Sequence, residues 1–332
     1  MSKNGQLISV SSAMHFLVDG LCMCCLFLLA EVYCRSLGAY GDRVSLGAVL
    51  LYNVVAFMSQ PLTGMLADRI VHRHWLLLSS ALLLTLAVAM ASLPVRAEWV
   101  LVLVAVVLGT GNSLFHVWGG KQTVVKMGND MRALGVFVST GALGLAVGAV
   151  FCSWTLLYGL LLVFVALSVA YVRWDEAGDT GGQAPLCSAG CAQDGAGPRV
   201  SRVTVWTLVV ALMLCVGYRS FAGEVFSQGI TKSQSLILTI GAVAMLGKMA
   251  GGWIARYVGI LPSVMVILAG VALCFLFRGQ FVWVLLLGIF LMNCTMPITL
   301  YLANLLLPKR EGLAFGLLAA ALIPGWLLAT YL

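Results

Sequence analysis

The sequence predicts an all-α polytopic membrane protein made of two related helical bundles. Of its 332 residues, 61% are hydrophobic and only 9% are charged, whereas a soluble domain carries about 25% charged residues. This much apolar surface cannot be buried in one globule, so lipid must be the solvent. The apolar runs are continuous over roughly 18 to 22 residues, which favours helices over a β-barrel.

Eleven apolar runs predict the membrane-spanning helices. Their ranges are 10–32, 45–67, 75–94, 98–120, 133–153, 155–172, 203–226, 234–255, 261–277, 281–304 and 311–332. A polar stretch rich in Gly, Ala, Asp and Pro, residues 173–202, reads as a flexible linker. It predicts a six-helix bundle over 1–172 and a five-helix bundle over 203–332. The missing counterpart of the sixth span indicates either truncation before a twelfth helix or an eleven-span variant.

The charge distribution predicts the orientation. With a cytoplasmic N-terminus, most of the 19 lysine and arginine residues fall on the inner side, as the positive-inside rule requires. We therefore expect a multi-pass protein of the plasma (inner) membrane with a cytoplasmic linker. The net charge of +7 then needs no nucleic acid to explain it.

The two halves contain matching elements in matching order. "GMLADRIVHR" at 64–73 closes the second span, and "GGWIARYVG" at 251–259 closes the second span of the other half. Both combine small residues with an arginine at the inner side. The pattern predicts two parallel repeats related by an axis along the membrane normal.

Three ionisable residues are candidates for proton coupling. His15 and Asp19 are four residues apart and share one face of the first span. Such residues usually face a bundle interior or a water-filled cavity, and a carboxylate beside an imidazole can hold a proton near neutral pH. His116 lies late in the antiparallel fourth span, at comparable depth. In the alternative, His15 caps or snorkels at the inner interface and His116 bonds a backbone carbonyl.

A guanidinium within the seventh span is the main candidate for substrate binding. Arg219 needs an acidic partner or an anionic ligand there, and it could bind a carboxylate or phosphonate group bidentately. His116 and Glu224 are the further substrate-binding candidates. Alternatively Arg219 pairs with Glu224 or Glu31 for structure alone, although the five-residue spacing to Glu224 is poor for an intrahelical pair. Lys248 lies near Arg256 in the sequence, and simple snorkelling to the interface would account for it.

Small residues along the fifth span predict close helix packing. Gly135, Gly144 and Gly148 follow a G-x8-G-x3-G spacing, and small side chains let membrane helices approach each other closely.

Several motifs together resemble a known transporter family. Gly64, Ala67, Asp68 and Arg69 in "GMLADR", followed by Arg73, resemble the major facilitator superfamily. "HFLVD" in the first span, "GTGNSLFH" in the fourth and "YRS" in the seventh are similar to its fosmidomycin-resistance group of drug exporters. The resemblance implies that the first and fourth spans line a central cavity. It also implies a cytoplasmic gate, for which the residues are Gly64, Asp68, Arg69, Arg73 and Arg256; a plain positive-inside loop is the alternative.

These observations predict a secondary active transporter that moves a small organic molecule by alternating access. Proton-coupled efflux by an antiporter is the first expectation, and the glycine spacing of the fifth span resembles the superfamily's antiporter motif. The alternatives are a proton-coupled uptake carrier for a sugar, an organic acid or a peptide, and a non-transporting sensor or inactive remnant. Neither a Walker loop nor an HExxH motif or serine elbow is present. We therefore expect no enzymatic activity, no cofactor and no metal, and we expect a monomer.

Overall fold

The computed structural model describes residues 3–37, 39–70, 74–94, 97–177, 201–228 and 230–331. Within them the regular structure is helical. The helices are α1 (Lys3–Leu37), α2 (Ala39–Asn53), η1 (Val54–Met58), α3 (Gln60–Arg69), α4 (Trp75–Ala91), α5 (Glu98–Met127), α6 (Met131–Val150), α7 (Trp154–Ala177), α8 (Arg202–Ser227), α9 (Gln234–Val258), α10 (Ile260–Leu276), α11 (Val282–Leu306), α12 (Glu311–Ala320) and α13 (Leu322–Tyr331). Most of the predicted linker, together with Arg73, lies outside the described residues.

The helices match the predicted spans closely, but two spans are interrupted. In the described residues, nine helical segments are long and apolar enough to cross a membrane. Two shorter apolar helices, α4 and α10, coincide with two further predicted spans. The second predicted span is divided into α2, the π-helical η1 and α3, and the last is divided into α12 and α13.

Proline explains both interruptions. Pro61 stands at the start of α3 and Pro324 near the start of α13. A proline has no N–H group to donate a hydrogen bond to the carbonyl oxygen of the residue four positions earlier. Its ring also clashes with that carbonyl group. For Pro324 that residue is Ala320, where α12 ends. For Pro61 it is Phe57, inside the π-helical turn, and such turns occur where the regular bonding ladder is disturbed. Periodicity alone did not predict these breaks.

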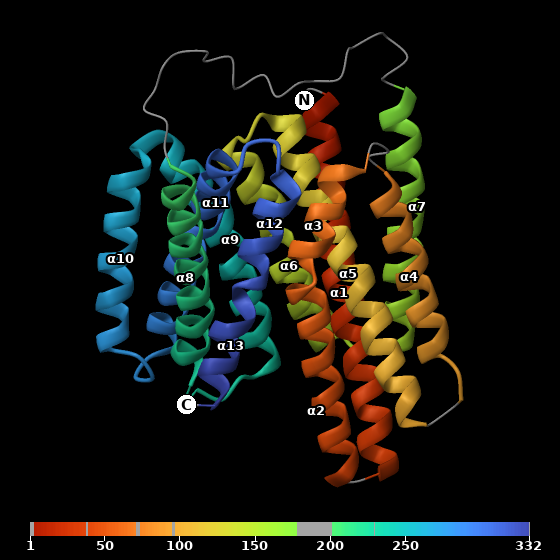
Figure 1. Cartoon of the computed structure of the whole chain (residues 1–332). Helices are drawn as coiled ribbons and strands as arrows, with labels where there is room; N and C mark the ends of the chain where they lie inside the picture. Colours follow the sequence, from red (N-terminus) through yellow and green to blue (C-terminus); the bar gives the residue numbers. More distant parts are fainter. Residues whose placement is uncertain are drawn as a thin grey trace.

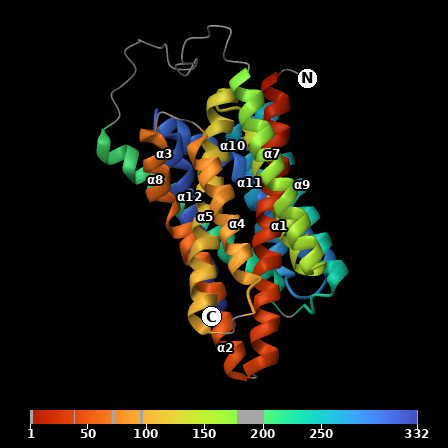
Figure 2. The same cartoon turned by 90° about the vertical axis from the view of Figure 1, so that its right-hand side faces the viewer.

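The helices form two bundles that lie side by side, α1–α7 in one and α8–α13 in the other (Figure 1). The N-terminal end of α1 lies at one edge of the molecule, and the C-terminal end of α13 lies toward the opposite edge, in both views (Figures 1 and 2). The two bundles meet where α6 packs on α9 and α3 packs on α12. These two contacts frame the space in which the predicted site residues lie.

The outer surface has the character expected of a chain surrounded by lipid. Large apolar side chains are exposed along α10, with Leu261 69%, Val266 70% and Leu276 74% accessible. Inside the N-terminal bundle, by contrast, the aromatic rings of Phe115, Trp118, Phe164 and Tyr171 are fully buried. On a chain this hydrophobic, the exposed apolar side chains are expected to contact lipid acyl chains rather than water.

Candidate functional site

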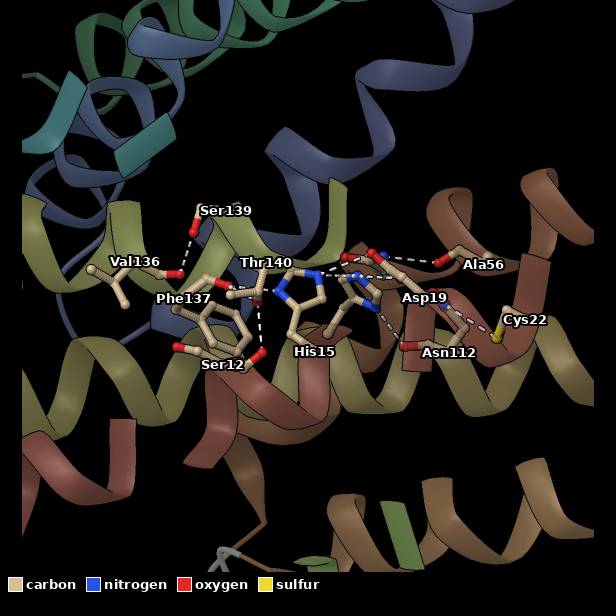
Figure 3. Close-up of polar contacts among 12 residues, drawn as sticks. Ser12, His15, Asp19, Cys22, Ala56, Asn112, Val136, Phe137, Ser139 and Thr140 are labelled. Carbon is tan, nitrogen blue, oxygen red and sulfur yellow. Dashed lines mark hydrogen bonds and ion pairs between the residues drawn. The ribbon is translucent and has the colours of Figure 1, made fainter. Parts of the chain in front are cut away.

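Three of the predicted residues come together between α1 and α5. The Nε2 atoms of His15 and His116 are 2.9 Å apart. The Asp19 carboxylate approaches both rings, with Oδ2 3.3 Å from His15 Nε2 and Oδ1 3.4 Å from His116 Nε2. The side chains of His15 and Asp19 point toward one another in Figure 3, and all three residues are buried. We call His15, Asp19 and His116 the histidine–aspartate cluster.

The hydrogen bonds of the outer ring nitrogens determine which tautomers fit. His15 Nδ1 lies 2.7 Å from the Phe137 carbonyl oxygen, and His116 Nδ1 lies 3.0 Å from that of Asn112. A carbonyl oxygen only accepts, so each Nδ1 carries a hydrogen. The bond between the two Nε2 atoms then needs a hydrogen on one of them, which makes that ring an imidazolium. The geometry therefore fits one proton shared by two histidines, with the Asp19 carboxylate as counter-charge.

Neighbouring groups hold this arrangement in place. Asn112 Nδ2 is 3.4 Å from Asp19 Oδ1, and Thr140 donates a 2.6 Å hydrogen bond to the Ser12 carbonyl, joining α6 to α1 beside His15 (Figure 3). Gly141 of α6 faces the cluster directly, and a Cβ there would meet Asp19 Oδ2 and the His15 ring. Sequence analysis did not single out Asn112, Thr140 or Gly141, because only the pairing of the helices shows what they face.

The cluster lies on the wall of a cavity of about 330 Å³ between the two bundles. On α1 the lining residues extend from His15 to Ala30, away from the edge where the chain begins. Most of the wall is apolar. Its lining residues are His15, Asp19, Met23, Leu26, Phe27, Ala30, Val49, Tyr52, Asn53, Phe57, Gln60, His116, Val138, Ala142, Leu145, Val216, Arg219, Lys248, Met296, Thr299, Leu300, Phe315, Leu318, Ala319 and Leu322.

Two cationic side chains reach this cavity from the C-terminal bundle. Arg219 of α8 is only 8% exposed, and its Nη1 has no hydrogen-bond partner among the described residues. Lys248 of α9 also lines the cavity. Simple snorkelling to the interface therefore does not describe its position.

The predicted acidic partners of Arg219 are elsewhere. Glu224 is half-buried and does not line the cavity, and Glu31 is exposed near the far end of α1. In the described part of the chain, Arg219 forms no ion pair with either carboxylate. Glu224 follows Arg219 by five residues, so the two side chains leave α8 in different directions. The position of Glu224 outside the cavity lining does not support its predicted role in binding substrate.

The cluster could in principle also hold a cation. The ligand atoms of His15, Asp19 and His116 lie within 4.8 Å of one another. In each histidine, Nδ1 bonds a backbone carbonyl and so orients Nε2, as at many metal sites. However, Arg219 and Lys248 face the same cavity, and their positive charges oppose a divalent ion. A proton, which the tautomers already require, fits the local charge better.

One predicted gate residue joins the two bundles at the N-terminal edge. Asp68 at the end of α3 accepts hydrogen bonds from the backbone N–H groups of Gly312 and Leu313, each 2.9 Å long, at the start of α12. Lys121 Nζ lies 3.4 Å from the same carboxylate. Gly64 packs against the backbone of Gly312, where a Cβ would collide. A carboxylate at a helix N-terminus is favoured by the free N–H groups and by the helix dipole.

A second contact between the bundles lies at the same edge, where α6 begins beside α9. Asp130 caps α6 through the backbone N–H of Arg132 and also accepts bonds from its guanidinium. These bonds, with a smaller contribution from nearby Arg256, lower the pKa of the Asp130 carboxyl. Arg256 and Arg69 are both exposed. The structure therefore places Asp68 and Gly64 inside the contact between α3 and α12, Arg69 at the exposed end of α3, and Arg256 near the second contact, between α6 and α9.

The three glycines of α6 each lie at a close backbone approach. A Cβ at Gly144 or Gly148 would collide with the α1 carbonyl of Phe16 or Gly20, and one at Gly135 would come 2.7 Å from the Lys248 carbonyl of α9. Helix α6 therefore packs tightly on α1 within its own bundle and on α9 across the bundles.

Two helical bundles around a shared cavity that holds ionisable side chains are the architecture of a secondary transporter. A family model described as Major Facilitator Superfamily matches residues 8–330. The chain belongs to this superfamily, and membership indicates a membrane transporter rather than an enzyme. No curated protein matches the sequence.

Solved structures share the fold at low sequence identity. The chain is similar to the human organic anion transporter MFSD10 (TETRAN), with a TM-score of 0.70, 15% identity, and 100% of this chain and 94% of that chain covered. It is also similar to the transporter FucP in its outward conformation, with a TM-score of 0.63, 14% identity, and coverage of 97% and 91%. A variant of the E. coli fucose:proton symporter FucP gives a TM-score of 0.66, 12% identity, and coverage of 99% and 91%.

Proposed function

We propose that the protein is a proton-coupled secondary transporter of a small organic anion. The observation that carries the proposal is the joint exposure of the histidine–aspartate cluster and of Arg219 to one cavity between the bundles. The cluster supplies a place for a proton, and the unpartnered guanidinium supplies a place for an anionic group. Rocking of the bundles around this cavity would give alternating access.

In the proton-carrying step, Asp19 provides the charge and the two histidines provide the proton acceptors. The shared proton between His15 and His116 is stabilised by Asp19 at 3.3 and 3.4 Å. A group whose charge changes near neutral pH is suited to this task. Because the cluster opens to the cavity, His116 can also respond to a substrate bound there.

Substrate binding is assigned first to Arg219. Its planar guanidinium can bind a carboxylate, sulfonate or phosphonate group with two parallel hydrogen bonds. Its Nη1 lacks a partner in the described residues, and a buried donor left unsatisfied costs about 1–3 kcal/mol. An anionic ligand would recover that cost. The similarity in fold to MFSD10, an organic anion transporter, is in keeping with this assignment.

The contact between Asp68 and the start of α12 is proposed as the cytoplasmic gate, with Gly64 packed inside it and Arg69 beside it at the end of α3, and with Arg256 at the neighbouring contact between α6 and α9. Arg73, the remaining residue of that prediction, lies outside the described residues. The proposal includes a monomer in the plasma (inner) membrane with a cytoplasmic N-terminus. The resemblance to the fosmidomycin-resistance group implies export, and uptake is the alternative direction.

The test is the substitution Asp19→Asn in reconstituted proteoliposomes. Proton movement is followed with an internal pH-sensitive dye while small carboxylates, phosphonates and sulfonates are added outside. We expect wild-type protein to couple at least one of these anions to proton movement, and the Asp19→Asn protein to lose this coupling. Glu98→Gln is the matched control, because Glu98 is exposed at the start of α5, away from the cavity. Unchanged coupling in Asp19→Asn protein of normal yield and thermal stability would remove Asp19 from the mechanism.

A further inference from the structure

We propose that Lys248 is a second cationic contact for the substrate, and that the proton and the anion bind together, so that transport is symport. This inference rests on the proposed function and adds the sign of the coupling. It starts from the charges of the cavity and from the division of these charges between the bundles.

The charged and titratable groups facing the cavity come from five helices. They are His15 and Asp19 of α1, Tyr52 of α2, His116 of α5, Arg219 of α8 and Lys248 of α9. The lining residues from η1, α3, α6, α11, α12 and α13 carry no titratable side chain. With Tyr52 neutral, the cavity therefore combines one carboxylate with two basic side chains and a histidine pair that accepts a proton.

The cavity therefore carries excess positive charge whether or not the histidine pair holds the shared proton. Without the shared proton, Asp19 balances one of the two cations. With it, Asp19 is balanced by the imidazolium, and both Arg219 and Lys248 remain uncompensated. Uncompensated charge in a poorly hydrated site is costly, and a ligand of opposite charge removes the cost. The anionic site is therefore most favourable when the proton is bound.

Lys248 is positioned to respond to this change. It lines the same cavity as Asp19 and Arg219, and it forms no hydrogen bond or ion pair with any of the described residues. When the histidine pair is unprotonated, the Asp19 carboxylate attracts Lys248. When the pair is protonated, His15 and His116 compensate Asp19, and Lys248 is left to a substrate anion.

The charges of the cavity also determine the sign of the linkage between proton and anion. If protonation raises the affinity for the anion, the anion raises the affinity for the proton by an equal factor. A cationic substrate would compete with the proton, which is the arrangement suited to antiport. The charges of this cavity thus favour anion–proton symport, and with an inward proton gradient they favour uptake over the export that the sequence motifs indicated.

The position of the groups makes binding depend on both bundles. The proton site belongs to α1 and α5, whereas Arg219 and Lys248 belong to α8 and α9. The rest of the wall is mainly apolar and includes the rings of Phe27, Phe57 and Phe315. A cavity of about 330 Å³ lies at the small end of ligand sites. The occupant we infer is a compact anion with an apolar, preferably aromatic, body.

Benzenesulfonate is the probe for the experiment, because its charge is the same at every pH used. Methyl phenyl sulfone is the neutral control and phenyltrimethylammonium the cationic control. Binding to the full chain in nanodiscs is measured by calorimetry between about pH 5.5 and about pH 8, the range in which histidine changes charge. We expect benzenesulfonate affinity to rise by about 5-fold to 150-fold as the pH falls, and neither control to follow this trend.

Variants separate this inference from the proposed function. Lys248→Met should weaken benzenesulfonate binding about tenfold or more at low pH, and Lys248→Arg should restore it. Asp19→Asn should bind the probe with little pH dependence. Lys232→Met is the control, because Lys232 is an exposed lysine outside the cavity. Thermal unfolding shows that each variant is folded.

Each outcome has a defined consequence. Affinity that falls as the pH falls, or preferential binding of the cation, would overturn symport of an anion while leaving proton coupling intact. Wild-type binding by Lys248→Met would overturn the assignment of Lys248 alone. Absence of benzenesulfonate binding at any pH would overturn the anionic substrate class. Anion binding that is independent of pH in wild-type protein would contradict the proposed proton site itself.

Discussion

The contact between Asp68 and α12 yields the most quantitative prediction. In Asp68→Ala, the start of α12 loses both hydrogen bonds from the N–H groups of Gly312 and Leu313 to a charged acceptor. Lys121, 3.4 Å from the carboxylate, also loses its acidic partner, although it keeps its 2.7 Å hydrogen bond to the Ala67 carbonyl. Since Asp68 belongs to one bundle and α12 to the other, the loss destabilises the closed contact between them.

The expected magnitude follows from these bonds and their exposure. Hydrogen bonds to charged groups contribute about 1.5–3 kcal/mol each, which is the upper limit for each of the two. Loss of a capping side chain at a hydrated helix end costs about 0.5–2 kcal/mol. The Asp68 side chain is 10% exposed, so water replaces its bonds only in part. We expect the closed contact to weaken by about 2 kcal/mol, or about thirtyfold in its equilibrium constant.

Hydrogen exchange measured by mass spectrometry in nanodiscs can detect this change. Protection of backbone amides reports the free energy of local opening. Peptides covering α3 and α12 should exchange about thirtyfold faster in Asp68→Ala. The matched control is Glu311→Gln, which also removes a negative charge from the first turn of α12 but makes no bond to the other bundle among the described residues. Unchanged exchange in Asp68→Ala, or an equal change in Glu311→Gln, would refute the reasoning.

Two further predictions concern stability. Gly148→Leu should destabilise the folded state by about 1–3 kcal/mol or more, because a side chain there meets the α1 backbone. Gly159→Leu is the control, since nothing lies near its Cβ position, and equal melting temperatures of the two variants would contradict the packing role. Asp175→Asn should cost about 3–5 kcal/mol, because the buried Asp175 carboxylate is 2.6 Å from Lys126 Nζ. Thermal unfolding beside the neighbouring exposed Glu176→Gln measures this, and a loss no larger than in the control would show that the pair contributes little.

Local sequence pattern was sufficient for the class of protein and for much of the helix layout. Hydrophobic run length depends only on consecutive residues and on the thickness of a bilayer. The spacing of His15 and Asp19 likewise follows from helix geometry, and their separation in the structure agrees with it. The equal depth of His116 could be inferred from the alternating direction of successive spans. Depth, however, does not determine the direction in which a side chain points.

What only the tertiary structure decided is which helix faces meet. The 2.9 Å contact of His15 with His116 joins residues 101 positions apart, and the bond to the Phe137 carbonyl spans 122. These contacts set the tautomers, and hence the shared proton. The position of Lys248 in the cavity and the capping of α12 by Asp68 are likewise decided by packing between bundles. The physical reason is that periodicity defines an apolar or polar face, whereas the rotation of each helix against its neighbours depends on close packing among residues far apart in the chain.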